Sequence, residues 1–337
     1  MVSIVVLNWN GENYIKECVD SLLAQRYENK EIIVVDNRSD DNSVDFLKNL
    51  YCDQIKIIEN KENLGFPAGN NIGVKNALGE FVFLVNNDTV TAPDCIEKMI
   101  DTANSSENIG CVACKIMFYS DRKRLDNVGL WLYRDGLNRV IGRNEIDKGQ
   151  YDDLNEVVGP SGCAGLWRKD VYELVGGMDE RYKFYGEDVE LGLKYRLLGY
   201  KCVFCKNAVV YHMGSKSIGS YSKEKAFLVE RNRLWVLLKI FPLRDILVSP
   251  YFTLKRYLYN LYSIKSGKGA AARFTDKEPP YTLILILIKV YLSALAGLPH
   301  ILKERRRLQK LRKISYKELR KWYIEKGISL KDLVLVD

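Results

Sequence analysis

The sequence predicts an α/β fold in which a mostly parallel sheet, flanked by helices, occupies residues 1–235 and a helical region occupies residues 236–337. Up to about residue 115, short apolar runs rich in Val and Ile alternate with runs of helical spacing. That alternation is typical of a parallel sheet with helices on both faces. From Leu234 onward the composition changes, because Leu, Tyr and Phe are mixed with scattered Lys and Arg.

Four apolar runs in the first part are expected to be strands, with helices between them. The strands are expected at residues 2–7, 31–35, 55–59 and 81–85, and the helices at 14–25, 44–50 and 68–77. The first of these helices has its apolar residues at helical spacing, namely Ile15, Val19, Leu22 and Leu23. The run 81–85 is apolar throughout, as expected for a strand that is buried on both faces.

The part from 116 to 235 is expected to continue the fold. An apolar pair at 157–158 leads into a turn of small residues at 159–165, and residues 166–175 are expected to be a helix that ends at Gly176 and Gly177. Another helix is expected to begin at Glu187, because Val189, Leu191, Leu193 and Leu197 follow it. The run 203–211 is expected to be a strand that ends at His212.

Small polar residues follow each of the four expected strands of the first part. Because the carboxyl ends of parallel strands meet at one edge of a sheet, these residues are expected to line a single ligand site. Taken singly, each group is also typical of an ordinary turn. Asp88, a carboxylate flanked by two amides, is suited to hold a divalent cation against a diphosphate. The residues are Asn8, Asn10, Asp36, Asn37, Asn63, Gly65, Asn70, Asn86, Asn87 and Asp88.

Two further groups are candidates for chemistry. Glu187 and Asp188 open a helix, where the backbone dipole favours acidic residues for structural reasons alone. The aromatic residues Phe184 and Tyr185 precede them, however, and would screen a carboxylate and tune it as a base. His212, one of two histidines, precedes a Gly-Ser-Lys turn at 214–216 and is either a metal or diphosphate contact or a hydrogen-bonded structural histidine.

The basic charge is concentrated near the C-terminus. The net charge is +8, and residues 301–331 hold 12 Lys and Arg against 3 Glu, so the remainder is about neutral. A positive segment on a neutral body favours an anionic partner such as a membrane or a nucleic acid, although solvated helix faces are often basic too. No nucleic-acid partner is expected, because no binding motif is recognised and acidic strand ends would repel phosphate without a metal.

The cysteine pattern bears on the redox compartment. The chain begins with a strand-like run that lacks the basic segment of a signal peptide, so the eight cysteines are expected to be reduced thiols. Two Cys-X-X-Cys pairs, Cys111 with Cys114 and Cys202 with Cys205, raise the alternative of a zinc site. Both pairs lie in strand-like sequence, where residues three apart point to opposite faces, which disfavours zinc.

Five motifs together resemble the family 2 glycosyltransferases of the GT-A fold, and most of all their rhamnosyltransferase-like subgroup. They lie in order at residues 2–11, 34–41, 63–66, 84–88 and 185–188, and the resemblance covers about residues 2–235. It implies a nucleotide-binding half at 1–115 and an acceptor-binding and catalytic half at 116–235. The composition and basic charge of residues 236–337 separately predict a membrane-associating region. The family's DxD motif reads Asn86-Asn87-Asp88 here, so an amide replaces one carboxylate.

By position, the resemblance implies a role for each candidate residue. Asp188 matches the catalytic base, and Glu187 and Gly162 are expected to contact the acceptor or the sugar. Asp88 is expected to bind Mn²⁺ or Mg²⁺ through the donor diphosphate, and His212 matches a position that can join this site. Asp36 is expected to recognise the pyrimidine base. The other nucleotide-sugar contacts are expected from Leu7, Asn8, Asn10, Asn37, Asn63, Gly65, Asn70, Asn86 and Asn87.

The implied reaction is an inverting transfer of rhamnose or a similar hexose from a UDP- or dTDP-sugar. Asp188 would remove the proton of an acceptor hydroxyl, and the metal would stabilise the charge on the departing diphosphate. The acceptor is expected to be a glycan linked to polyprenyl diphosphate, in the synthesis of cell-surface polysaccharide or glycoprotein. A non-catalytic nucleotide-sugar-binding module and a nucleotidylyltransferase-like enzyme are the alternatives.

The C-terminal third contains an apolar stretch at 281–302 that is long enough to span a bilayer. Its polar residues fall on one helical face, which favours an interfacial or protein-packed helix over a transmembrane one; they are Lys289, Ser293, Gly297 and His300. The basic run 303–313 would meet anionic head groups. The expected location is therefore the cytoplasmic face of the cell membrane, as a peripheral or monotopic enzyme. Earlier in this region, Pro242 and Pro250 are expected to interrupt helical structure, with linkers at 266–269 and 278–280.

Overall fold

The computed structural model describes residues 1–214 and 221–335, and the chain divides into two compact units. The sheet unit comprises Met1–Leu130, Val140–Arg196 and Tyr200–Ser215. The helical unit comprises Trp131–Arg139, Leu197–Gly199 and Lys216–Asp337. The chain therefore leaves the sheet unit near residue 215, about 20 residues before the division at 235 that the sequence analysis expects.

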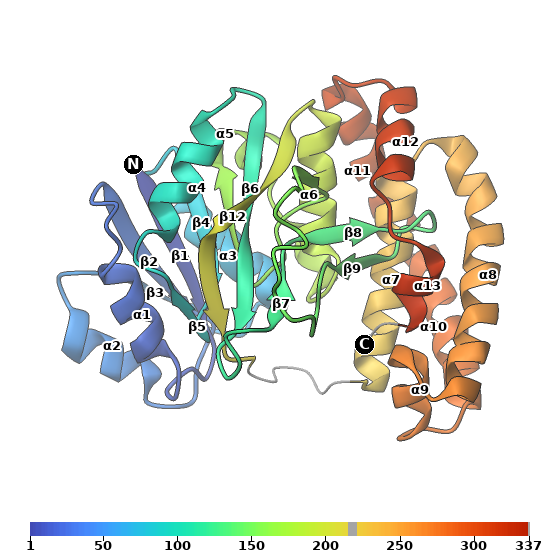
Figure 1. Cartoon of the computed structure of the whole chain (residues 1–337), viewed down its shortest axis with the longest axis horizontal. Coiled ribbons are helices and arrows are strands. Elements are labelled where there is room, and N and C mark those ends of the chain that lie inside the picture. Colours follow the sequence, from blue (N-terminus) through green and yellow to red (C-terminus); the bar gives the residue numbers. More distant parts are fainter. Residues whose placement is uncertain (215–220, 336–337) are drawn as a thin grey trace. The chain divides into compact units, whose positions relative to one another are not determined.

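The sheet unit is built on a ten-stranded, mostly parallel sheet (Figure 1). Its strand order is β10-β12-β6-β11-β4-β1-β2-β3, with β5 paired to β12 and β7 paired to β6. Six strands run in one direction, and β11 lies antiparallel between β4 and β6. The strands are β1 (Val2–Asn8), β2 (Lys30–Asp36), β3 (Lys56–Glu59), β4 (Phe81–Asn86), β5 (Thr89–Thr91), β6 (Ile109–Phe118), β7 (Leu125–Asn127), β10 (Glu156–Val157), β11 (Ala164–Arg168) and β12 (Lys201–His212). A separate two-stranded sheet pairs β8 (Leu130–Leu132) with β9 (Asn138–Val140).

Helices cover both faces of this sheet, as the sequence analysis expects. On β1, Ile4 faces the core shared with α1 and α4, whereas Val5 and Leu7 face the glycines of α3. This alternation follows from the two-residue period of a strand. The helices are α1 (Ile15–Leu23), α2 (Ser43–Tyr51), α3 (Phe66–Lys75), α4 (Cys95–Asn104), α5 (Lys169–Leu174) and α6 (Glu187–Leu197), with a short 3-10 turn at Glu180–Tyr182.

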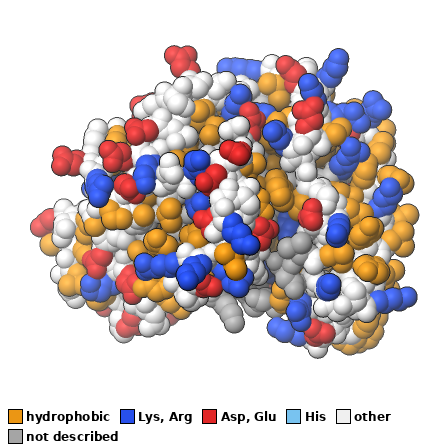
Figure 2. Space-filling view, viewed as in Figure 1, with side chains coloured by type: hydrophobic (Ala, Val, Ile, Leu, Met, Phe, Trp, Pro, Cys, Tyr) orange, Lys and Arg blue, Asp and Glu red, His pale blue; other side chains and the backbone are white. Residues whose placement is uncertain are grey.

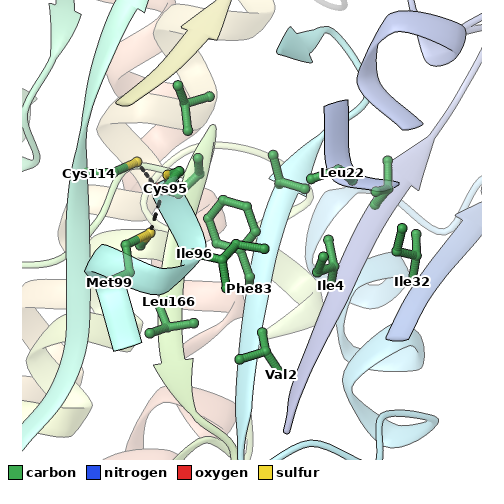
Figure 3. Packing of buried hydrophobic residues seen from close by; sticks show 14 of the residues in the cluster. Val2, Ile4, Leu22, Ile32, Phe83, Cys95, Ile96, Met99, Cys114 and Leu166 are labelled. Carbon is green, nitrogen blue, oxygen red and sulfur yellow. Dashed lines mark hydrogen bonds between the residues drawn. The ribbon is translucent and has the colours of Figure 1, made fainter. Parts of the chain in front are cut away.

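The core on one face of the sheet is dry and closely packed. Ile4, Leu22, Phe83 and Ile96 have no exposed surface and lie against one another (Figure 3). Cys95 belongs to the same core, and burial raises the pKa of its thiol. Both Cys-X-X-Cys pairs lie as expected in strands, β6 and β12, where all four side chains are buried.

One expected helix of the sheet unit is wrong in its first part. Residues Leu166–Arg168 belong to β11, and α5 begins only at Lys169. The backbone of β11 is hydrogen-bonded to β4 on one side and to β6 on the other. Two neighbouring strands therefore outweigh the local helical spacing, which is a weak preference.

The helical unit is formed mainly by seven helices. They are α7 (Lys223–Ile240), α8 (Leu243–Ser266), α9 (Gly269–Thr275), α10 (Tyr281–Ala296), α11 (Leu298–Leu311), α12 (Tyr316–Glu325) and α13 (Leu330–Leu335). Pro242 precedes α8, as expected, but Pro250 lies inside α8 without ending it. A proline leaves the carbonyl four residues earlier without its usual donor. Here that carbonyl, on Ile246, accepts a hydrogen bond from the Ser249 hydroxyl at 2.8 Å.

The expected continuous helix at 281–302 is wrong, because it is two helices bent by 60°. The break falls at Gly297, where an added Cβ would lie 2.8 Å from the Trp235 ring. The polar stripe of this region faces α7: the Lys289 ammonium is 5.1 Å from the Phe227 ring centre, and the His300 and Trp235 ring centres are 6.2 Å apart. Within the described residues, no single helix has the length and apolarity to cross a membrane, although the bent pair α10 and α11 meets that test by length and composition.

A buried ionic network joins α7 and α8 to the turn between β8 and β9. Asp135 accepts from Arg256 Nε at 2.7 Å, and Glu230 Oε1 lies 2.6 Å from Arg256 Nη1. Glu230 Oε2 also pairs with Arg233 Nε at 3.0 Å. Burial alone would raise the pKa of Glu230, but the two guanidinium groups lower it to about 2. The network therefore favours the charged forms of Glu230, Arg233 and Arg256 inside the unit.

Replacing Asp135 with Ala is expected to destabilise the helical unit by about 3–5 kcal/mol, because two buried guanidinium groups would share one carboxylate. Urea unfolding followed by tryptophan fluorescence measures the change. The matched control is Glu173→Ala, which breaks the ion pair to Lys169 at a side chain that is 53% exposed and is expected to cost at most about 1 kcal/mol. Equal stability of the two variants would contradict the role given to the network.

Candidate active site

The carboxyl ends of β1, β2 and β4 lie side by side, as the sequence analysis expects. In the sheet register, Asn8 is opposite Asp36 and Leu7 is opposite Asn86. The two residues after β4, Asn87 and Asp88, form the turn into β5. β5 pairs with the end of β12, which places His212 opposite Thr89. Residues 2–8, 30–36, 81–91 and 201–212 therefore contribute to one edge of the sheet.

Asn8 connects three strand ends through its side-chain amide. It has no exposed surface, and its Nδ2 donates to Asp36 Oδ1 and to Ser43 Oγ, both at 2.9 Å. Its Oδ1 accepts from Asn87 Nδ2 at 2.8 Å. A primary amide can do this because it has both donors and an acceptor. The Asn8 side chain therefore fixes the ends of β1, β2 and β4 relative to one another.

Asp36 fixes the loop that follows β2. It is 3% exposed, its Oδ2 accepts from the Ser39 backbone N–H at 2.9 Å, and its Oδ1 accepts from the Ser39 hydroxyl at 2.5 Å. Asn10 ties the loop after β1 to the same segment, because its Oδ1 accepts from the Asp40 N–H at 2.9 Å. The expected contact of Asp36 with a base stays a prediction, and these bonds show what holds the carboxylate in place.

Asn37 holds the loop before α3 with both ends of its amide. Its Nδ2 donates to Asn63 Oδ1 at 2.9 Å and to the Gly65 carbonyl at 3.2 Å. Its Oδ1 accepts from Asn60 Nδ2 and from the Leu64 N–H, both at 3.1 Å. Asn37 is 2% exposed, so within the described structure its buried amide holds this loop in place through these four hydrogen bonds.

The loop before α3 also needs two glycines. Gly65 has φ +85°, a conformation that favours glycine. At Gly69, an added Cβ would lie 2.3 Å from Leu7 Cδ1, so the helix backbone can approach β1 only without a side chain. Asn70 is 1% exposed and donates to the Phe66 carbonyl at 2.9 Å. Asn37, Gly65 and Asn70 thus set the conformation of this loop and its approach to β1, and their expected contacts with a ligand stay predictions.

Asp88 and His212 face each other at this edge. Asp88 is 2% exposed, and its Oδ2 lies 3.3 Å from His212 Nε2. His212 Nδ1 lies 2.5 Å from Asp126 Oδ2, and Asp126 also pairs with Arg143. Burial would lower the pKa of His212, but Cys163, Asp126 and Asp88 raise it further than burial lowers it. Asp126 was missed by the sequence analysis, because β7 is a three-residue strand with no recognisable pattern.

The Asp88 and His212 pair fits a divalent cation that a ligand helps to hold. Two neighbouring ligand atoms of an octahedral ion bound at about 2.1 Å lie about 3 Å apart, close to the 3.3 Å seen here. The carboxylate on Nδ1 is the arrangement that orients a metal-binding histidine. Across residues 1–214 and 221–335, no group of three or more His, Cys, Asp and Glu side chains is arranged to hold a metal ion. Substrate phosphate and water would have to complete the coordination, as is usual for Mg²⁺.

Glu187 and Asp188 open α6 in different environments. Asp188 is half-buried, and it accepts from the Gly162 N–H at 3.0 Å and from the Val189 N–H at 2.7 Å. Burial raises the pKa of Asp188 above its ordinary value, although these N–H groups offset part of the effect. Glu187 is 6% exposed, and among the described residues its Oε2 has no hydrogen-bond partner. Burial and the charge of Asp188 raise the pKa of Glu187 well above its ordinary value.

A strained loop precedes this carboxylate pair. Lys183, Tyr185 and Gly186 all have positive φ, at 63°, 67° and 93°. The Phe184 N–H donates to the Tyr182 carbonyl at 2.8 Å, across a single residue. Such strain in residues other than glycine is concentrated at functional sites. The aromatic residues Phe184 and Tyr185 were expected here from the sequence, but no sequence pattern predicted the positive φ angles of Lys183 and Tyr185.

Residues 162 and 163 connect the carboxylate pair to the strand-end cluster. The Gly162 N–H binds Asp188, and the Cys163 carbonyl accepts from the Asn86 N–H at 2.9 Å. The Cys163 side chain is close enough to His212 to perturb its titration. The structure thus brings together every expected site residue along one connected region. Ser215 and Lys216 of the expected turn after His212 lie outside the described residues.

The sequence was compared with families and with curated proteins. The model of glycosyl transferase family 2 matches residues 3–175. An uncharacterized glycosyltransferase of Rickettsia felis is 38% identical over 304 residues, covering 86% of this chain and 48% of that protein. An uncharacterized glycosyltransferase of Rickettsia prowazekii is 30% identical over 195 residues, covering 58% of each. The O-antigen biosynthesis protein RfbC of Myxococcus xanthus is 30% identical over 230 residues, covering 64% of this chain and 17% of that protein.

The chain spans 58% or less of the length of each of these three relatives. Likeness to them therefore concerns the part they share with this chain. The similarity to the Rickettsia felis protein extends beyond residues 3–175, which the family model matches, because that alignment covers 86% of the chain.

Solved structures with a similar fold were also found. The first 349 residues of TarS from S. aureus, solved with UDP, match with a TM-score of 0.55 at 18% identity, covering 95% of this chain and 91% of that one. The mannosyltransferase PcManGT from Pyrobaculum calidifontis, solved with GDP-Man and Mn²⁺, matches with a TM-score of 0.52 at 16% identity, covering 92% and 85%. These likenesses confirm the expected GT-A fold.

Proposed function

Because this chain belongs to glycosyl transferase family 2, we propose that it moves rhamnose or a similar hexose from a UDP- or dTDP-sugar to a hydroxyl of a glycan acceptor, with inversion. The observation that carries the proposal is the difference between the half-buried carboxyl group of Asp188 and the buried one of Glu187. Residues 162 and 163 join this pair to the strand-end cluster.

Asp188 is the base in this proposal. Its two backbone N–H donors favour the charged form of the carboxylate, and its partial exposure leaves it open to an acceptor. The acceptor hydroxyl would give its proton to Asp188 while its oxygen bonds to the anomeric carbon. The bond from that carbon to the diphosphate breaks in the same step, on the opposite face of the sugar. A single displacement of this kind inverts the anomeric configuration.

Glu187 has a different task. Burial and the charge of Asp188 raise its pKa and so favour the neutral carboxyl group, which can donate a hydrogen bond. Since its Oε2 has no partner within the described structure, a sugar hydroxyl is the natural complement of this carboxyl group. The two neighbouring acids are thereby separated into a base and a neutral donor by their environments, as in other pairs of catalytic carboxyl groups.

The donor is held at the ends of β1, β2 and β4. The rigid frame of Asn8, Asp36 and Asn87 supports the proposed pocket for a pyrimidine nucleotide. The UDP complex of TarS and the GDP-Man complex of PcManGT have the same fold, which supports a nucleotide-linked donor. A divalent cation held by Asp88 and His212 would supply positive charge to the departing diphosphate.

The acceptor and location follow from a relative and from the chain's charge. RfbC, an O-antigen biosynthesis protein, supports a role in cell-surface polysaccharide synthesis. We place the enzyme at the cytoplasmic face of the cell membrane, with an acceptor linked to polyprenyl diphosphate. The basic segment 301–331, with 12 Lys and Arg against 3 Glu, supports contact with an anionic membrane surface.

Replacing Asp188 with Asn is expected to lower kcat by about 10²–10⁴-fold while UDP binding is retained, because the amide cannot accept the proton. The matched variant is Glu187→Gln, which is expected to stay within about tenfold of wild type because an amide can replace a neutral carboxyl as a donor. Release of UDP or dTDP in the presence of acceptor measures both. Near wild-type turnover in Asp188→Asn, or a larger loss in Glu187→Gln, would refute the two roles.

Mn²⁺ is expected to increase the affinity for UDP in the wild-type protein, and Asp88→Asn is expected to reduce this increase by about tenfold or more. Titration calorimetry with UDP, with and without Mn²⁺, measures it independently of turnover. The control is Asp121→Asn, which changes a carboxylate that is 47% exposed and paired with Arg124. An Mn²⁺ effect that is the same in Asp88→Asn as in wild type would exclude Asp88 as a ligand.

A further inference from the structure

Helix α8 buries only polar side chains, whereas most of its apolar side chains are exposed. Its buried residues are all polar, namely Ser249, Thr253, Arg256 and Ser263. Its exposed large residues are Leu243, Leu247, Val248, Tyr251, Leu254, Leu258, Tyr259, Leu261 and Tyr262. Leu247 is 80% exposed and Leu254 is 58% exposed. A helix on the surface of a water-soluble unit has the opposite distribution.

The ionic network explains what holds α8 in this orientation. Arg256 is fixed by Asp135 and Glu230, and the Thr253 hydroxyl donates to Asp135 at 3.2 Å. Turning the apolar side inward would leave the Arg256 charge without its two carboxylates. The outward apolar face is therefore a consequence of the buried network, and it requires an apolar environment outside the unit.

The charged residues of helices α8, α10 and α11 are mostly basic. Helices α8, α10 and α11 contain two acidic residues, Asp245 and Glu304, and both pair with an arginine at side chains that are 13% and 19% exposed. The same helices carry ten Lys and Arg residues, of which Arg244, Lys255 and Lys265 are exposed on α8. Figure 2 shows hydrophobic side chains gathered at the right edge over α8, with Lys and Arg between them. Such a surface complements an anionic bilayer.

A cavity of about 270 Å³ opens beside α8 in the helical unit. Two cations line it, Arg134 and Lys255, together with aromatic and apolar side chains such as Tyr133, Phe252 and Ile328. The Arg134 guanidinium lies 5.0 Å from the Phe252 ring centre. None of the described residues that line the cavity is acidic. Cationic groups above apolar walls suit a phosphate that is attached to a hydrocarbon chain.

We propose that α8 lies in the headgroup region of an anionic lipid bilayer, with its apolar face toward the acyl chains, and that the Arg134 and Lys255 cavity receives a lipid phosphate. α10 adds exposed Ile284, Leu285, Ile288, Leu292 and Leu295 to the apolar surface of the same unit. This inference rests on the helical unit alone and does not require the proposed transfer reaction.

Sedimentation of the full chain with vesicles tests the apolar face. Wild type is expected to bind vesicles containing phosphatidylglycerol, and Leu254→Glu with Leu258→Glu is expected to bind at least about tenfold more weakly. Both side chains are more than half exposed, so the fold should be kept, and a thermal melt checks this. The matched control is Leu78→Glu with Leu174→Glu, two exposed leucines of the sheet unit at 79% and 50%, which should bind as wild type does.

A second pair of changes tests the cavity. Arg134→Gln with Lys255→Gln is expected to reduce the preference for phosphatidylglycerol over phosphatidylcholine vesicles by about 30-fold, since each cation near an anionic surface contributes about 1 kcal/mol. Competition by inorganic phosphate separates a free phosphate site from a lipid site, because only the former would be saturated without vesicles. An unchanged lipid preference, or full saturation by inorganic phosphate, would overturn the cavity assignment.

Two results would overturn the bilayer as occupant of the α8 face. One is equal vesicle binding by wild type and the Leu254 and Leu258 variant. The other is a wild-type dimer that does not bind vesicles and that the same variant converts to a monomer, which would assign the face to a second copy of the chain. UDP binding is measured on every variant, so that a failure of the lipid proposal is distinguished from a failure of the transferase proposal.

Discussion

The site depends above all on the buried amide of Asn8. It bonds to Asp36 and Ser43 on one side and to Asn87 on the other, so one side chain sets the relative positions of three strand ends. Because Asn8 has no exposed surface, losing one of these three partners would leave a polar atom of its buried amide unsatisfied. The loops that follow these strands are then fixed by hydrogen bonds of Asp36 and Asn37, so the proposed donor site rests on segments with defined positions.

In the proposed reaction, the chemistry depends on how the two carboxyl groups of α6 differ in their environments. Asp188 accepts two backbone hydrogen bonds and is accessible, whereas Glu187 is buried beside it. The strained residues Lys183 and Tyr185 hold the entry to α6 in this arrangement. In the helical unit, the network around Asp135 fixes the orientation of α8, and in the sheet unit Asn8 fixes the positions of the strand ends. In both places, buried polar groups determine which side chains are presented outward.

Much of this could be predicted from the sequence, and the parts that could not have physical reasons. The strand ends were predictable because parallel strands must present their carboxyl ends at one edge, and the Asn-rich loops after β1, β2 and β4 gave a repeated signal. Asp126 was not predictable, since it reaches His212 from a three-residue strand. Residues 166–168 have helical spacing but form β11, because two neighbouring strands pair with them. The outward orientation of the apolar face of α8 could not be predicted. Sequence periodicity shows that a helix is amphipathic, but it does not show which face a buried ionic network will hold inside.

The central claim is a single displacement in which Asp188 removes the acceptor proton. The most direct measurement is the anomeric configuration of the first-formed product, determined by NMR and compared with that of the nucleotide-sugar donor. The account predicts that the product has the opposite configuration. A product that retains the donor configuration would contradict the claim, because retention requires either two displacements or attack from the side of the departing diphosphate.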